Sequence, residues 1–197
     1  MAPTLELEKN IGGIVCGIDE AGRGPWCGPV VAAAVIVGAD VIAGVNDSKK
    51  LSEKKREQLY AQIISSCQYG VGQASVQEID DLNIIAATKL AMLRAYEALP
   101  VKAAYALIDG NSLPNLPCAM QYVIKGDSVS YSIAAASIIA KVTRDKLVGQ
   151  MAAEFPQYNW HSNKGYGTKC HIEALDKYGI TVHHRKSYQP IKMRLAS

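Results

Sequence analysis

The stretch Gly17-Ile18-Asp19-Glu20-Ala21-Gly22-Arg23-Gly24-Pro25 joins a short apolar run to a glycine-rich turn, and most of the expected architecture depends on it. Residues 14–18 form the apolar run, which predicts a strand with Asp19 and Glu20 at its carboxyl end. Residues 30–37 follow a Gly-Pro pair and are the longest apolar run in the chain, so they predict a second, buried strand. Strand, turn and strand in this order predict a β-hairpin.

The rest of the chain alternates between helical and extended patterns. Apolar residues at helical spacing predict one long helix over residues 77–99, ended by Pro100; they are Ile79, Leu82, Ala86, Leu90 and Leu93. The remaining expected elements are helices over residues 51–65 with Ser52 as N-cap, 130–155, and 168–178 ended by Gly179, strands over 69–76, 104–108 and 121–124, and a polar loop over 156–167. This order predicts an α/β fold with a mixed sheet flanked by helices.

Length and composition are those of a globular protein in a reducing compartment. The 197 residues suit one domain, and 49% are hydrophobic and 20% charged. The first ten residues do not resemble a secretory signal, and no apolar run reaches the roughly 18 residues that a membrane helix needs. The five cysteines are odd in number and lack CxxC spacing, which argues against a disulfide framework or a zinc site. We therefore expect a cytoplasmic protein without a membrane segment.

Charge is unevenly distributed along the chain. From residue 160 onward seven lysines and arginines stand against two acids, a net charge of +5, whereas the whole chain carries +3. All four histidines also lie in this segment. A basic C-terminal helical part suits a polyanionic partner, although a solvated charged face would give the same composition.

Three apolar strands are followed by acids: Asp19 and Glu20, then Asp109, then Asp127. In open α/β sheets the active cleft lies at the carboxyl ends of the strands, so these acids are expected to converge. An all-carboxylate set without His or Cys favours Mg²⁺ or Mn²⁺ over Zn²⁺, and two ions held there would suit phosphodiester hydrolysis. An Asp-Gly pair at a strand end is also ordinary turn chemistry, and spacing alone leaves both interpretations open.

Six sequence blocks identify a family resemblance. The opening stretch resembles the signature of bacterial ribonuclease HII, and the other blocks follow in that family's order over nearly the whole chain. These blocks are Asn46-Asp47-Ser48-Lys49-Lys50-Leu51, Ile108-Asp109-Gly110-Asn111, Lys125-Gly126-Asp127-Ser128, Ala134-Ala135-Ala136-Ser137-Ile138-Ile139-Ala140-Lys141-Val142-Thr143-Arg144-Asp145 and Lys164-Gly165-Tyr166-Gly167-Thr168.

The resemblance implies a fold, an activity and a metal site. The fold would be ribonuclease H-like, with a central mixed sheet of about five strands and a C-terminal helical part. The activity would be hydrolysis of RNA in RNA–DNA hybrids and incision beside single ribonucleotides in duplex DNA, leaving 3′-hydroxyl and 5′-phosphate ends. Asp19, Glu20, Asp109 and Asp127 match the family's four metal-binding carboxylates. Asp145 is a weaker candidate, which we expect to pair on the surface.

The resemblance also implies substrate contacts. Gly22, Arg23 and Gly24 match the loop that reads the DNA–RNA junction, and Tyr166 matches the tyrosine that packs on a neighbouring sugar. A tight turn and a half-buried loop tyrosine are the plain structural alternatives. Ser48, Lys49 and Lys50 precede an expected helix and suit phosphate contacts, or else form a solvated charge pair. His184-Arg185-Lys186 is interpreted as an exposed basic tail, or as an additional contact to the nucleic-acid backbone.

Some features depart from the family pattern or leave rivals open. Trp26-Cys27 stands where a small or aliphatic pair is expected, and it either packs under the loop or shapes the nucleic-acid groove. Residues 192–197 contain no sliding-clamp motif, so we expect a monomer that is not tethered to a clamp. The rivals are ribonuclease HIII, a non-catalytic hybrid-binding protein on the same fold, and another nuclease of this fold such as a junction resolvase.

Overall fold

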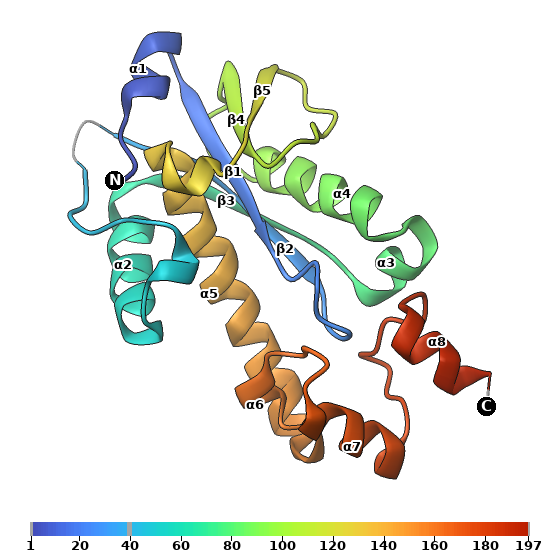
Figure 1. Cartoon of the computed structure of the whole chain (residues 1–197). Helices are drawn as coiled ribbons and strands as arrows, with labels where there is room; N and C mark the ends of the chain where they lie inside the picture. Colours follow the sequence, from blue (N-terminus) through green and yellow to red (C-terminus); the bar gives the residue numbers. More distant parts are fainter. Residues whose placement is uncertain (1, 39–40, 197) are drawn as a thin grey trace.

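The computed structural model describes residues 2–38 and 41–196, and its centre is the five-stranded mixed sheet that the sequence predicts (Figure 1). The strand order is β3-β2-β1-β4-β5. β1 pairs antiparallel with β2 and parallel with β4, β2 pairs antiparallel with β3, and β4 pairs parallel with β5. The strands are β1 (Val15–Ala21), β2 (Val30–Ile36), β3 (Gln68–Ala74), β4 (Tyr105–Asp109) and β5 (Ala119–Val123).

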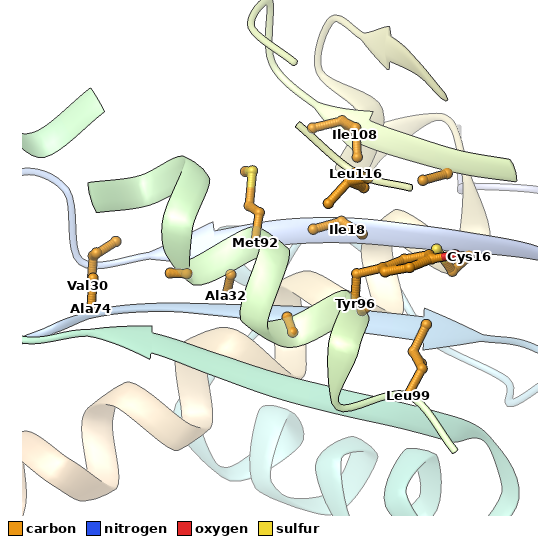
Figure 2. Close-up of a cluster of buried hydrophobic side chains, with 14 of the residues drawn as sticks. Cys16, Ile18, Val30, Ala32, Ala74, Met92, Tyr96, Leu99, Ile108 and Leu116 are labelled. Atoms are coloured by element: carbon orange, nitrogen blue, oxygen red, sulfur yellow. The ribbon is translucent and has the colours of Figure 1, made fainter. Parts of the chain in front are cut away.

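Helices cover both faces of this sheet. One face packs against α5 (Tyr131–Glu154) and α2 (Glu53–Ser66), and the other packs against α4 (Ile84–Glu97). Figure 2 shows the second face, where Met92 and Tyr96 of α4 lie over Cys16 and Ile18 of β1. Alternate residues of a strand point to opposite faces. Even-numbered positions of β1 therefore face α4, and odd-numbered positions face α5.

Close approach of helix and sheet depends on glycine at two strand positions. A Cβ atom at Gly17 would lie 2.2 Å from the backbone nitrogen of Ile133 in α5, and one at Gly72 would lie 2.3 Å from the carbonyl oxygen of Ala91 in α4. Neither gap admits a side chain, because both obstacles are helix backbone. The sheet is thus held between two helices at backbone contact, which fixes where the strand ends lie.

The single long helix predicted over residues 77–99 is wrong. The structure has two helices there, α3 (Val76–Leu82) and α4, which meet at Asn83. Asn83 has a φ of 70°, and its side-chain oxygen accepts hydrogen bonds from the N–H groups of Ile85 and Ala86, so it caps α4. Leu82, which was expected on the buried face, is 43% exposed because the chain turns immediately after it.

The C-terminal part packs at the far end of α5, away from α1 (Figure 1). It contains α6 (Trp160–Asn163), α7 (Lys169–Tyr178) and α8 (Gln189–Leu195), and its buried side chains form a separate cluster around Trp160, Tyr158 and Ile191. Gly179 ends α7 as predicted, with a φ of 81°. The short helices α1 (Glu6–Ile11), α6 and α8 were not predicted. Among the described helices, none has the length and apolar character required to cross a bilayer.

Candidate metal centre and active site

Three acids meet at the carboxyl ends of three neighbouring parallel strands. Asp19 lies near the end of β1, Asp109 is the last residue of β4, and Asp127 lies in the 3₁₀ turn η2 (Gly126–Ser128) that follows β5. Each offers one carboxylate oxygen, and these three oxygens lie within 4.8 Å of one another. The predicted convergence is therefore observed for these three residues.

Glu20 lies beside this group but is not part of it. As the next residue after Asp19 in β1, it points to the α4 face of the sheet, whereas Asp19 points to the α5 face. Its Oε1 atom lies 3.2 Å from Nη1 of Arg23. Glu20, Arg23 and Asp109 line a smaller cleft on the α4 side as well as the main cleft, so the two clefts meet at the acids.

Burial and mutual repulsion dominate the electrostatics of the acids. Asp19 and Asp127 are each 4% exposed. Burial, followed by the charges of Glu20 and Asp109, raises the pKa of Asp19 well above its ordinary value. Burial and then the charge of Asp109 raise the pKa of Asp127. Two buried carboxylates with raised pKa values beside a third acid fit a site for divalent cations, which would neutralise the repulsion through oxygen ligands.

A lysine lies at the edge of the acid cluster. Ser48, Lys49 and Lys50 form the 3₁₀ turn η1, and the Asp47 side chain caps it by accepting a hydrogen bond from the Lys49 N–H. Lys49 Nζ lies 3.5 Å from an Asp127 oxygen. Burial alone would lower the pKa of Lys49, but the charges of Asp127, Asp19 and Asp47 raise it above its ordinary value.

The two neighbours of Lys49 make other contacts, and Ser48 also lines the main cleft. Ser48 is buried, and its N–H donates to the hydroxyl of Ser137. Lys50 Nζ donates to the hydroxyl of Ser128, next to Asp127.

Two glycine-containing loops close the main cleft, which has a volume of about 290 Å³. The recognition loop (residues 22–24) follows β1, and the tyrosine loop (residues 164–168) precedes α7. A Cβ atom at Gly24 would lie 3.2 Å from the Tyr166 ring, so the two loops touch. Tyr166 is 49% exposed. Gly22 has a φ of 99°, and a Cβ there would lie 2.1 Å from the Arg144 side chain, so glycine is required at this position by the protein itself.

Trp26 packs against the tyrosine loop, whereas the two alternatives from the sequence are packing under the loop of residues 22–24 and shaping the nucleic-acid groove. A Cβ at Gly167 would lie 2.0 Å from the Trp26 ring, and the Trp26 N–H donates to the carbonyl of Gly165 at 2.8 Å. Cys27 is fully buried, and burial raises the pKa of its thiol to about 12. Both residues thus pack against the tyrosine loop from the interior of the protein.

The expectation of an exposed basic segment at His184-Arg185-Lys186 is wrong for two of its three residues. His184 and Arg185 are fully buried, and only Lys186 is exposed. His184 Nδ1 accepts a hydrogen bond from the Thr181 N–H, so its Nε2 carries the proton and donates to Nε2 of His171. His171 in turn donates from Nδ1 to the carbonyl of Tyr166. The two histidines therefore hold the tyrosine loop and make no outward contact.

Residues that the sequence analysis missed line or support the same cleft. Lys141 lies in the cleft wall and pairs with Asp145 at 2.6 Å, so Asp145 is paired as expected, but with a half-buried partner in the cleft. Arg144 is 2% exposed and donates to the carbonyls of Cys27, Pro29 and Lys164. Both residues lie within a quoted block, but the role of Arg144 depends on partners far away in the sequence.

Comparisons with known proteins agree with the geometry. The sequence profile of the family "Ribonuclease HII" matches residues 16–191. The chain is 55% identical over 203 residues to ribonuclease HII of Magnetococcus marinus, covering 98% of this chain and 95% of that protein. It is 50% identical over 191 residues to ribonuclease HII of a Wolbachia from Brugia malayi, covering 96% and 94%.

A solved structure supports the same assignment. The crystal structure of ribonuclease H2 from Pyrococcus horikoshii superimposes with a TM-score of 0.75 at 25% identity, covering 92% of this chain and 97% of that chain. The profile match spans all five strands, the three clustered acids and both loops of the cleft. The chain therefore belongs to the ribonuclease HII family.

Proposed function

We propose that the chain is a metal-dependent endoribonuclease that hydrolyses the RNA strand of RNA–DNA hybrids. It also incises duplex DNA on the 5′ side of single embedded ribonucleotides, leaving 3′-hydroxyl and 5′-phosphate ends. The observation that carries this proposal is the set of three carboxylates at neighbouring strand ends, two of them buried and one half-buried, with ligand oxygens within 4.8 Å, in a chain of the ribonuclease HII family.

Asp19, Asp109 and Asp127 would hold Mg²⁺ or Mn²⁺, with Glu20 joining them from the other face of β1. All four offer hard oxygen ligands, and none of the ligand atoms is nitrogen or sulfur. Two such ions, when bound, supply the activated water and stabilise the leaving oxygen of a phosphodiester. The raised pKa values of Asp19 and Asp127 support this role, because they mark a site where negative charge is in excess.

The chain's own residues would bind and orient the substrate around these acids. Gly22, Arg23 and Gly24 offer backbone groups beside Asp19 in the cleft wall, and the 2′-hydroxyl is the group that separates RNA from DNA there. The exposed Tyr166 ring would pack on a neighbouring sugar. Contacts to phosphates would come from Ser48, Lys49 and Lys50.

We propose a single domain over residues 1–197, with about 160–197 as its basic C-terminal part. Two sets of hydrogen bonds support this proposal, because they join the C-terminal part to the rest of the domain: Arg144 of α5 donates to the carbonyl of Lys164, and Arg185 donates to the carbonyl of Gly22 after β1. We also propose that the chain acts as a monomer without a sliding clamp. Light scattering with and without duplex would test the oligomeric state.

The decisive experiment is incision of a DNA duplex that holds one ribonucleotide. We expect a nick on its 5′ side with Mg²⁺ or Mn²⁺, no cleavage of the all-DNA duplex, and no cleavage in excess chelator. Ca²⁺ should bind and support little turnover, because its larger and looser coordination shell misplaces the water and the leaving oxygen. Binding without metal-dependent nicking would instead assign the chain as a hybrid-binding protein, and cleavage in chelator would end the two-metal interpretation.

A further inference from the structure

Arg185 is a fully buried arginine whose hydrogen bonds go almost entirely to one loop. Its guanidinium donates to four carbonyls of the β1–β2 connection and to the hydroxyl of Tyr188. The carbonyl partners are Gly22 at 2.6 Å, Pro25 at 2.7 Å, Gly28 at 2.8 Å and Arg23 at 3.0 Å. Among the residues that the structure describes, no carboxylate forms an ion pair with it. Backbone carbonyls therefore take the place of a counter-ion.

This arrangement determines how the recognition loop faces the cleft. In a trans peptide the C=O of one residue and the N–H of the next point in opposite directions, and the described chain contains no cis peptide. The carbonyls of Gly22 and Arg23 both point inward to Arg185, so the N–H groups of Arg23 and Gly24 point away from the interior. Neither N–H has a hydrogen-bond partner among the described residues.

Arg185 is itself fixed from several directions. Its N–H donates to the carbonyl of Trp26 at 2.8 Å, and the neighbouring His184 forms a β-bridge with Cys27. On its other side, both carboxylate oxygens of Asp80 accept hydrogen bonds from the N–H groups of Lys186 and Ser187. The guanidinium is thus a rigid anchor, since the backbone around it is bound to both the loop and α3.

Tyr188 extends the anchor. Its hydroxyl accepts a hydrogen bond from Arg185 and donates to the carbonyl of Arg23. A lysine at position 185 could not reproduce this arrangement, because its three donors radiate from one nitrogen, whereas the planar guanidinium spreads five donors along a fork.

We propose that Arg185 is a positioning residue for ribonucleotide recognition, which keeps the N–H groups of Arg23 and Gly24 turned toward the bound sugar. This inference rests on the proposed function. Arg185 touches no substrate atom, and it acts by fixing which side of two peptide planes faces the cleft. The 2′-hydroxyl oxygen would accept from these N–H groups, and a deoxyribose offers no such acceptor.

The test measures preference and not total activity. Binding of the full-length protein to a duplex with one ribonucleotide is compared with binding to the matched all-DNA duplex, in Ca²⁺ to limit turnover. Arg185→Lys should reduce the wild-type preference by about tenfold, as expected for losing one or two hydrogen bonds, while affinity for the all-DNA duplex changes much less. Tyr188→Phe should reduce the preference by a smaller factor, about two- to threefold.

The control is Ile191→Val, a fully buried residue of the same C-terminal cluster that makes no hydrogen bond to the recognition loop. It should leave the preference unchanged, whereas a merely structural role of Arg185 would lower both affinities together in all three variants. If Arg185→Lys does not fold, Tyr188→Phe decides the matter alone. An unchanged preference in the folded variants, or a wild type without any preference, overturns the inference. Failure of the proposed function has a different signature, namely no incision by the wild type in Mg²⁺.

Discussion

Buried acids and buried arginines lie next to the recognition loop, and their surroundings differ: the acids lie beside other acids, whereas the arginines are surrounded by hydrogen-bond acceptors. The acids Asp19 and Asp127 are buried beside other acids, and their pKa values are raised. The arginines Arg144 and Arg185 are buried beneath the loop, where carbonyl oxygens accept from their guanidiniums. Burial lowers the pKa of Arg144 to about 10, which leaves it charged at neutral pH.

The acids form a site whose excess negative charge a bound cation would neutralise. The arginines form a site in which the protein itself supplies the hydrogen-bond acceptors. Carboxylates that repel one another destabilise the folded protein until a cation arrives. Arginines that donate to several buried carbonyls stabilise the fold, and removing one leaves those carbonyls without partners. Neutralising an acid and removing an arginine should therefore change stability in opposite directions.

The largest expected effect follows from Asp19→Asn. Cleavage should fall by about 10³-fold or more, because one of the three clustered carboxylates loses its charge. Without metal the variant should be more stable at pH 7, because folding raises the pKa of Asp19 and the ionised form then opposes folding. For the same reason, the wild type without metal should become more stable as the pH falls toward the raised pKa of Asp19, because the carboxyl is then protonated.

Melting curves and single-turnover rates should be measured on the same samples. A gain of about 1 kcal/mol would raise Tm by about 2–4 °C. Asp176→Asn is the matched control, because Asp176 is an exposed acid paired with Arg194 outside the cleft. Normal cleavage by Asp19→Asn would show that the metal-site assignment is wrong.

The opposite change in stability is expected for Arg144→Met, which is the next largest effect. Three carbonyls would lose their donor inside the protein, at a cost of about 3 kcal/mol, or about 6–12 °C in Tm. Arg94→Met removes a half-exposed arginine paired with Glu78 and should cost less than about 1 kcal/mol. If both variants lose the same amount of stability, the buried hydrogen bonds of Arg144 contribute no more than the ion pair of Arg94.

Tyr166 tests whether the cleft wall contributes through a ring or a hydroxyl. The ring lies against Gly24, and among the described residues no partner donates to or accepts from its hydroxyl. Tyr166→Ala should lower the single-turnover rate on a one-ribonucleotide duplex by about tenfold, as for a lost stacking contact, and Tyr166→Phe should stay near the wild-type rate. Equal losses in both would mean that the hydroxyl is the essential group, and no loss in either would make Tyr166 a structural residue.

The smallest expected effect concerns the lysines at the acid edge. Replacing Lys49 and Lys50 with Ala should weaken binding to every duplex and flatten the salt dependence by up to about two units, because each phosphate contact contributes about 0.9. Lys49 forms an ion pair with Asp127, which partly neutralises its charge toward a phosphate. The change in slope should therefore be smaller than about two units. Replacing Lys169 and Lys177 of α7 is the control, and an equal change in slope there would argue against a specific phosphate site.

The parts of the fold that depend on local pattern could be predicted. The strand runs, the N-cap at Ser52 and the stop at Gly179 all follow from neighbouring residues. The convergence of Asp19 and Asp109 was expected from the general rule that active clefts lie at the carboxyl ends of strands, and it required that β1 and β4 be neighbours. The turn at Asn83 could not be predicted, because helical periodicity continues through it and no Gly or Pro marks it. The side chain of Asn83 supplies the cap that lets the helix restart in a new direction.

The burial of His184 and Arg185 could not be predicted, because it depends on partners far away in the sequence. His184 and Arg185 are polar residues in a polar segment, so composition alone indicates an exposed position. Their burial becomes favourable only because the carbonyls of the β1–β2 connection and the ring of His171 lie beside them. Glu20 is a different case: its side chain faces away from Asp19 because β1 continues through both residues, and this alternation is a local property of the strand.

The long separation between the recognition loop and its anchor has a consequence for synthesis. All three clustered acids lie within the first 127 residues of the chain, whereas the loop that begins at Gly22 is held by Arg185. At synthesis rates of about 5–20 residues per second, the roughly 60 intervening residues take about 3–12 s to appear. During that interval the nascent chain has all three clustered aspartates but lacks Arg185, so the carboxylates are synthesised before the residue that we propose positions the recognition loop.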